Sequence, residues 1–223
     1  MELVNDSYRI SGIDVRSLCE KYGTPLYVYD CSRMIGQYNK MINAFSYPKL
    51  KINYACKALT NINILKVFKE LGAGLDTVSI QEVWLGLRAG FDPKDIIYTP
   101  NCVSFGEIQL AVKEGVRINI DNISILDQFG YEYRDKVPVC IRINPHIMAG
   151  SHMKTSVGHI DSKFGISIHQ IPLVQRIIET HGIRVEGMHM HTGSDILDVD
   201  VFLRGAEILF DVARKFPSLE YID

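Results

Sequence analysis

Short apolar segments alternate with amphipathic segments along most of this chain, beginning near residue 30. Each unit has a run rich in β-branched and aromatic residues, one or two polar residues, a stretch with apolar positions three or four apart, and a glycine. This order is typical of parallel strands joined by crossover helices. Strands are predicted at residues 52–56, 75–78, 96–99, 117–120, 139–143, 185–190 and 219–222.

The ends of the predicted helices carry local signals. Ser79 with Glu82, and Ser104 with Glu107, have the S-x-x-E spacing of a capping box directly after a predicted strand. Glycines at positions 72, 90, 115 and 182 stand where a helix exit favours a left-handed residue. An earlier helix is expected to begin after Asp30 and to bury one apolar stripe in the core. The stripe consists of Met34, Ile35, Tyr38, Met41, Ile42 and Phe45.

The repeat predicts an α/β fold, a TIM-type (β/α)₈ barrel over residues 30–223 with about seven of its eight strands present. A doubly wound open sheet is the competing fold, but neither its usual glycine-rich turn G-x-G-x-x-G nor a P-loop occurs. Residues 1–29 do not follow the repeat, and their strand-like pieces at 8–10 and 26–29 are expected to pair outside the barrel. Residues 144–164 carry no clear helix or strand signal and predict a long loop, which is expected to be functional or mobile.

Composition narrows the class of protein. Apolar residues make up 47% and charged residues 22% of the 223 positions, which are values of a globular protein. The 24 basic and 26 acidic residues give a net charge of −2 without a basic cluster, so we expect no nucleic-acid partner. We expect no membrane span or signal peptide, and the five scattered cysteines lack a C-x-x-C spacing. A cytoplasmic protein with reduced thiols is predicted.

Polar or ionisable residues stand at or just past the carboxyl ends of all the predicted strands. In a barrel of this type, catalysis is built at that edge. The pattern therefore predicts an active site there, although strands also end in polar residues for solubility alone. The residues are Lys57, Asp76, Asn101, Asp121, Arg142, His191 and Asp223.

Lys57 is the candidate nucleophile. It follows the apolar strand INYAC, so its ammonium is expected at the barrel mouth with little water around it. Desolvation lowers the pKa of a lysine and frees the amine for a Schiff base, either to a carbonyl substrate or to pyridoxal phosphate. A surface lysine that reaches bulk water is the alternative. Arg142 is expected to pair with Asp76 or Asp121, in a structural or a catalytic role.

His189 and His191 fall on one face of a predicted strand, because side chains repeat every two residues. As metal ligands they would need a third ligand from a neighbouring strand end. As a cofactor platform, one imidazole would lie flat on a planar ring, while Gly193 and Ser194 offer backbone and hydroxyl donors. A structural pair of histidines is the third interpretation, and local sequence leaves all three open.

Six segments occur in an order that is highly specific for one family: YGTPLYVYD, YACKA, GAGLDTVS, IRINP, SKFGI and HMHTGSDI. Through essentially its whole length the chain resembles the alanine-racemase-like, fold type III decarboxylases that depend on pyridoxal phosphate (PLP). The stretch INPHIMAGSHMKTSVGHIDSKFGI is similar to the diaminopimelate decarboxylases in particular, because ornithine- and arginine-type members lack this long insert.

The resemblance implies roles for the candidate residues. Lys57 would carry the Schiff base to PLP, and His191 would stack on the face of the pyridine ring as the second catalytic residue. His189 has no assigned role in this pattern, which favours a site without metal. Ser194, together with Gly193, would reach the phosphate of the cofactor.

Two further cofactor contacts are implied, Asp76 and Arg142, which would line the site near the lysine and the phenolic oxygen of the ring. The implied reaction converts the small amino acid meso-2,6-diaminoheptanedioate to L-lysine and CO₂, the last step of lysine biosynthesis, in a homodimer. The family's glycine-rich phosphate loop, its E-P-G-R segment and its C-terminal β-domain do not occur in this sequence. We therefore expect an N-terminal portion, residues 1–29 of which would pair with that β-domain, with weak PLP binding and little activity.

Three alternatives to this function stay open. The first is a related decarboxylase that acts on another basic or dicarboxylic amino acid. The second is a noncatalytic barrel relative that acts through a partner, although the intact Lys57 and His191 argue against it. The third is a metal-dependent barrel hydrolase built on His189, His191 and Asp76.

Overall fold

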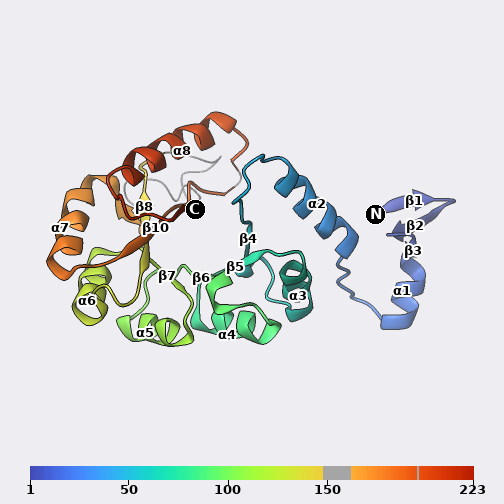
Figure 1. The fold of residues 1–223 in the computed structure, drawn as a ribbon. Coiled ribbons are helices and arrows are strands. Elements are labelled where there is room, and N and C mark those ends of the chain that lie inside the picture. The colour runs from blue at the N-terminus through green and yellow to red at the C-terminus, as the bar shows by residue number, and fades with distance from the viewer. Residues whose placement is uncertain (148–161, 195) are drawn as a thin grey trace.

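A curled sheet of parallel strands forms the centre of the molecule. The computed structural model describes residues 1–147, 162–194 and 196–223. The strand order is β11-β10-β8-β7-β6-β5-β4, with the short β9 beside β8 (Figure 1). The strands are β4 (Asn53–Ala55), β5 (Gly74–Thr77), β6 (Ile96–Tyr98), β7 (Arg117–Ile120), β8 (Val139–Asn144), β9 (Ile166–Ser167), β10 (Val185–Met190) and β11 (Tyr221–Ile222). The predicted α/β fold, an incomplete barrel, is confirmed.

Helices cover the outer face of this sheet (Figure 1). They pack on it through buried side chains such as Val83, Ile108, Leu126 and Val174, which belong to the same core as the strand residues. The helices are α3 (Ile62–Glu70), α4 (Ile80–Ala89), α5 (Phe105–Glu114), α6 (Ile123–Tyr133), α7 (Ile171–His181) and α8 (Val199–Ala213). Short 3₁₀ turns lie at Cys56–Ala58, Pro93–Asp95 and Ile168–Gln170. This alternation of strand and helix aligns the carboxyl ends of the strands at one edge.

The strand predictions differ little from the structure. Strands β7 and β10 have the predicted bounds, whereas β11 is shorter than the predicted 219–222. Strand β9 is an addition, directly after the predicted loop 144–164, and most of that loop lies outside the described residues.

In each predicted capping box, one of the two expected hydrogen bonds is present. The hydroxyls of Ser79 and Ser104 accept from the backbone N–H of Glu82 and Glu107, both at 3.3 Å. The return bonds differ from the prediction. Glu82 accepts from the N–H of Val78 at 2.8 Å, and Glu107 accepts the first backbone N–H of α4 at 3.3 Å. Glu107 therefore ties α5 to the preceding helix instead of closing its own cap.

The glycine exits are confirmed. Gly90, Gly115 and Gly182 are the C-caps of α4, α5 and α7, each in the left-handed region. Gly72 has a φ of 82° just after α3.

The prediction of a buried stripe on α2 (Cys31–Asn43) is wrong. Asp30 caps this helix as expected, accepting from the N–H of Arg33 at 3.2 Å. None of its residues is buried, and Met41 at its end is 54% exposed. The helix lies beyond β4, at the edge of the open sheet (Figure 1). Its apolar side therefore faces a groove of about 430 Å³, which Phe68 of α3 also lines, instead of a closed core.

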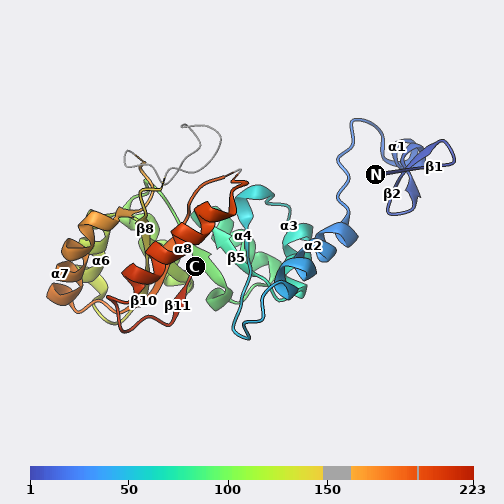
Figure 2. The same cartoon turned by 90° about the horizontal axis from the view of Figure 1, so that it is seen from above.

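The N-terminal residues form a unit of their own. Strands β1 (Glu2–Val4), β2 (Ser7–Ile10) and β3 (Ile13–Asp14) make an antiparallel sheet, followed by α1 (Val15–Tyr22). Figures 1 and 2 show this unit standing apart from the curled sheet. Residues 26–29 are not a strand, so that prediction is wrong; their apolar side chains are exposed. The pairing of residues 1–29 with a further β-domain stays a prediction.

Two other expectations concern the whole chain. Within the described residues, no helix has the length and apolar character needed to cross a bilayer. The five cysteines are free thiols, as expected. Burial raises the pKa of Cys56 to about 12, so this thiol next to Lys57 is protonated at neutral pH.

A close approach between β10 and β11 depends on one glycine. Gly187 pairs with Tyr221, and an added Cβ would lie 2.3 Å from the ring carbon Cζ of this tyrosine. We expect Gly187→Ala to lower the free energy of unfolding by about 1–3 kcal/mol, through overpacking, in urea titrations. Gly106→Ala is the control, because its Cβ would meet nothing nearer than the Ser104 hydroxyl at 3.7 Å. Equal midpoints for the two variants would contradict this prediction.

Candidate active site

A cavity of about 390 Å³ lies at the carboxyl ends of the parallel strands. Five of the predicted site residues line it together: Lys57, Asp76, Arg142, His191 and Ser194. They come from four strands and the segments that follow them, and the parallel register brings their side chains to one edge. Gly193, next to Ser194, has a φ of 146° and is not among the lining residues.

Lys57 reaches the cavity from the 3₁₀ turn that follows β4. The turn places it directly after the buried Cys56. Lys57 itself is exposed, so the expectation that little water surrounds its ammonium is wrong. The physical reason is its position: β4 is an edge strand of an open sheet, and solvent reaches it from that side.

Arg142 is the buried cation of the site. It lies on β8 with 7% of its surface exposed, and burial lowers its pKa. The carboxylates of Asp121 and Asp76 oppose this shift. The ring centroid of Phe164 lies 4.9 Å from its guanidinium carbon. Both carboxylates stabilise the charge of Arg142, but the described residues contain no direct ion pair between Arg142 and either of them, so the predicted pairing is not formed.

Asp76 is the acid of the site. Burial raises its pKa to about 6, partly offset by a hydrogen bond with Thr99 and by the charges of Lys57 and Arg142. Asp223, directly after the edge strand β11, raises the pKa further. At neutral pH this carboxyl is mostly ionised, because its pKa lies about one unit below the pH.

His189 and His191 are both neutral at physiological pH. Burial, followed by the charges of Arg142 and Lys57, lowers the pKa of His191 to about 4. Burial and the same two cations, with His191 as a further cause, lower the pKa of His189 to about 3. Both residues line the cavity. A neutral imidazole suits stacking on a planar ring. The described residues contain no group of three or more His, Cys, Asp or Glu side chains that could hold a metal ion.

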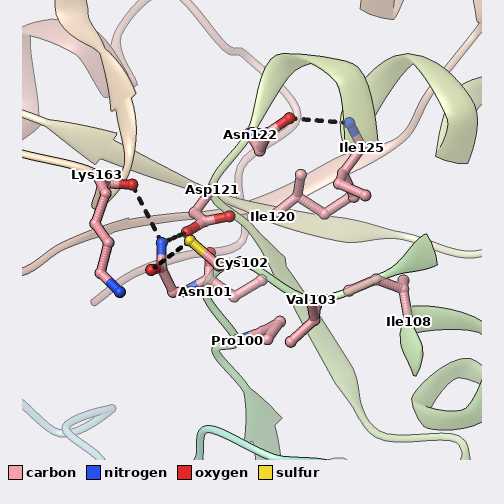
Figure 3. Close-up of a pocket in the computed structure, with 11 residues that line it drawn as sticks. Pro100, Asn101, Cys102, Val103, Ile108, Ile120, Asp121, Asn122, Ile125 and Lys163 are labelled. Atoms are coloured by element: carbon pink, nitrogen blue, oxygen red, sulfur yellow. Dashed lines mark hydrogen bonds between the residues drawn. The ribbon is translucent and has the colours of Figure 1, made fainter. Parts of the chain in front are cut away.

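Residues to which the family resemblance assigns no role complete the lining. They are Val78, Thr99, Asn101, Lys163, Phe164 and His189. The position of Asn101 at a strand end indicated that it lies at the site. Lys163 and Phe164 lie in SKFGI, one of the segments that carry the family resemblance. Figure 3 shows the smaller pocket beside the cavity, where the Asn101 carboxamide points between Asp121 and the backbone of Lys163.

The fold and the cavity define a parallel α/β-barrel protein with a lysine, a buried arginine and neutral histidines at the catalytic edge. A family model of the pyridoxal-dependent decarboxylases, describing their pyridoxal-binding domain, matches residues 32–220. The chain belongs to this family, and the cofactor of the family is pyridoxal phosphate.

Several relatives are diaminopimelate decarboxylases. The chain is 40% identical over 221 residues to the enzyme of Methanothermobacter thermautotrophicus, covering 96% of this chain and 52% of the relative. It is 33% identical to the Bacillus subtilis enzyme, covering 90% and 48%. A solved structure from M. jannaschii in complex with L-lysine superposes with a TM-score of 0.85 at 28% identity, covering 99% and 55%. The chain thus spans about half the length of the curated relatives it matches.

The residues present fit the cofactor of the family. Lys57 offers an amine for the aldehyde, His191 a neutral planar ring, Arg142 a buried cation and Ser194 a hydroxyl, all in one cavity. The specific contact of each residue with the cofactor stays a prediction.

The pKa of Asp76 generates a stability prediction. Because its pKa rises from 3.8 to about 6 on folding, ionisation of Asp76 destabilises the folded chain, and stability is lost as pH rises through this window. Asp76→Asn removes this effect. We expect its advantage in unfolding free energy over the unmodified chain to grow between pH 4 and pH 7 by up to about 3 kcal/mol in urea titrations. Asp135→Asn, at an exposed site, controls for the loss of one charge; an advantage that does not change with pH would contradict the prediction.

Proposed function

We propose that this chain forms the cofactor-binding barrel of a PLP-dependent carboxy-lyase that converts meso-2,6-diaminoheptanedioate to L-lysine and CO₂. The observation that carries the proposal is the single cavity lined by Lys57, Asp76, Arg142, His191 and Ser194. The relatives named diaminopimelate decarboxylase support the substrate, as do two of their structures in complex with L-lysine.

Lys57 and His191 would hold the reactive part of the cofactor. Pyridoxal phosphate, when bound, supplies an electron-accepting ring that takes up the electrons released as CO₂ leaves. The amine of Lys57 is the chain's nucleophile toward the aldehyde, and it would hold a proton at Nζ when the substrate amine displaces it. The neutral ring of His191 would lie flat on the pyridine without adding a second positive charge to the site.

Arg142 and Asp76 would orient the cofactor. Arg142 is buried, and the negative charges of Asp121 and Asp76 stabilise its own charge, so it would present a positive charge to the phenolic oxygen. Asp76 lies close enough to Lys57 for their charges to interact, and would keep the ammonium of Lys57 within the cavity. Ser194, with the backbone of Gly193, would bind the phosphate.

The open sheet bears on the activity of this chain. A second cavity of about 260 Å³ lies between the edge strands, lined by Ala55 of β4 and by Asp223 after β11. Solvent therefore reaches the site from the side of Lys57. The proposal includes weak PLP binding and low turnover for the chain alone, a cytoplasmic location, and a homodimer for the enzyme that contains this barrel.

Another basic amino acid is the competing substrate. The lysine/ornithine decarboxylase of Vibrio vulnificus superposes with a TM-score of 0.78 at 24% identity, a likeness that supports the fold alone. Diaminoheptanedioate is favoured as the substrate, because relatives named diaminopimelate decarboxylase, with 29–40% identity, match nearly the whole chain.

A borohydride trap tests the proposal. The chain is incubated with PLP, reduced with borohydride and digested, and peptides are mapped by mass spectrometry. We expect the phosphopyridoxyl group predominantly on Lys57, because the other cavity groups would stabilise a Schiff base at this lysine. Lys57→Arg is expected to abolish that adduct, whereas Lys66→Arg, on the exposed side of α3, leaves it unchanged. Label spread evenly over surface lysines of the folded chain would contradict the proposal.

A further inference from the structure

The carboxamide of Asn101 joins three segments at the catalytic edge. Its Nδ2 donates to the Oδ2 of Asp121 at 2.5 Å and to the backbone oxygen of Lys163 at 3.1 Å (Figure 3). Its Oδ1 accepts from the thiol of Cys102 at 3.2 Å. Asn101 follows β6, Asp121 follows β7, and Lys163 precedes β9, so one side chain connects elements that are 62 residues apart at the widest.

The segment that Asn101 holds covers Arg142. Phe164 follows Lys163, and its ring lies 4.9 Å from the guanidinium carbon of Arg142. Gly165 then permits the return to β8: its φ is +82°, and an added Cβ would lie 2.8 Å from the backbone of Ile143. A hydrogen bond to the Lys163 carbonyl therefore fixes the position from which Phe164 packs on Arg142.

A second route from Asn101 to Arg142 is electrostatic. The hydrogen bond from Asn101 lowers the pKa of Asp121, which burial raises. Asp121 in turn stabilises the charge of Arg142 against its own burial. By stabilising the ionised carboxylate of Asp121, Asn101 therefore also supports the charge of Arg142.

We propose that Asn101 is a positioning residue, which holds Asp121 and the Lys163–Phe164 segment so that the guanidinium of Arg142 is enclosed and fixed for the cofactor. The inference rests on the proposed function in one respect, that Arg142 contacts the cofactor. Its test needs no cofactor, so the two can fail separately.

The test measures how fast Arg142 reacts with phenylglyoxal, a reagent selective for arginine, by peptide mapping of the cofactor-free chain. Arg142 is 7% exposed and is expected to react slowly, while the exposed Arg88 serves as the internal standard. Asn101→Asp replaces the donor by an acceptor that repels Asp121 and the Lys163 carbonyl. We expect the relative rate at Arg142 to rise about tenfold, the change that the loss of about 1.4 kcal/mol of hydrogen bonding produces.

Two further variants make the outcome decisive. Asn101→Ala removes both hydrogen bonds without adding charge, and it is also expected to raise the rate at Arg142. It allows the test to be made even where Asn101→Asp does not fold. Asn122→Ala is the matched control: Asn122 lines the same small pocket and caps α6 through the N–H groups of Ser124 and Ile125, at 2.8 and 3.2 Å. It is expected to lower thermal stability but leave the rate at Arg142 unchanged. Unchanged rates in folded Asn101 variants, or an equal rise in Asn122→Ala, would overturn the inference.

Discussion

The hydrogen-bonded register of the parallel sheet decides which side chains reach the edge where the site lies. Arg142 of β8 stands opposite His189 of β10, and Asp76 of β5 stands opposite Ala55, two residues before Lys57. A side chain in a strand has no freedom to change face, because a shift of one residue would reverse the whole pattern. The register therefore brings Asp76, Arg142 and His189 to one edge, and the segments that follow the strands add Lys57, His191 and Ser194 there.

Burial at this edge sets the charge of each group. Low solvation disfavours every charged form, so both histidines lose their protons and Asp76 holds its proton to about pH 6. Arg142 is the exception, since a guanidinium keeps its proton in proteins and must be compensated by neighbours. Two carboxylates and an aromatic face supply that compensation. The positive charge of the buried site is thereby concentrated on one side chain.

Local sequence predicted the repeated part of the fold well, because strand composition, N-cap serines and exit glycines act over a few residues. It also placed Lys57, Asp76, Arg142, His191 and Ser194 at one edge, since strand ends and family motifs coincide there. The wrong predictions concern edges. Whether the stripe on α2 or residues 26–29 are covered depends on neighbours that the pattern does not encode. The bond between Asn101 and Lys163 spans 62 residues and has no local signature.

The two sides of the site differ in how far solvent reaches them. Asp76 and His189 line both the main cavity and the second cavity between β4 and β11. On that side Lys57 is exposed, whereas on the other side Arg142 is enclosed by packed strands, Phe164 and Asp121. A cofactor would therefore meet a buried cation at its phenolic oxygen and a solvent-exposed amine at its aldehyde. Because preorganised groups lose little entropy on binding, the Arg142 side would contribute most to recognition, and the lysine would add the covalent bond.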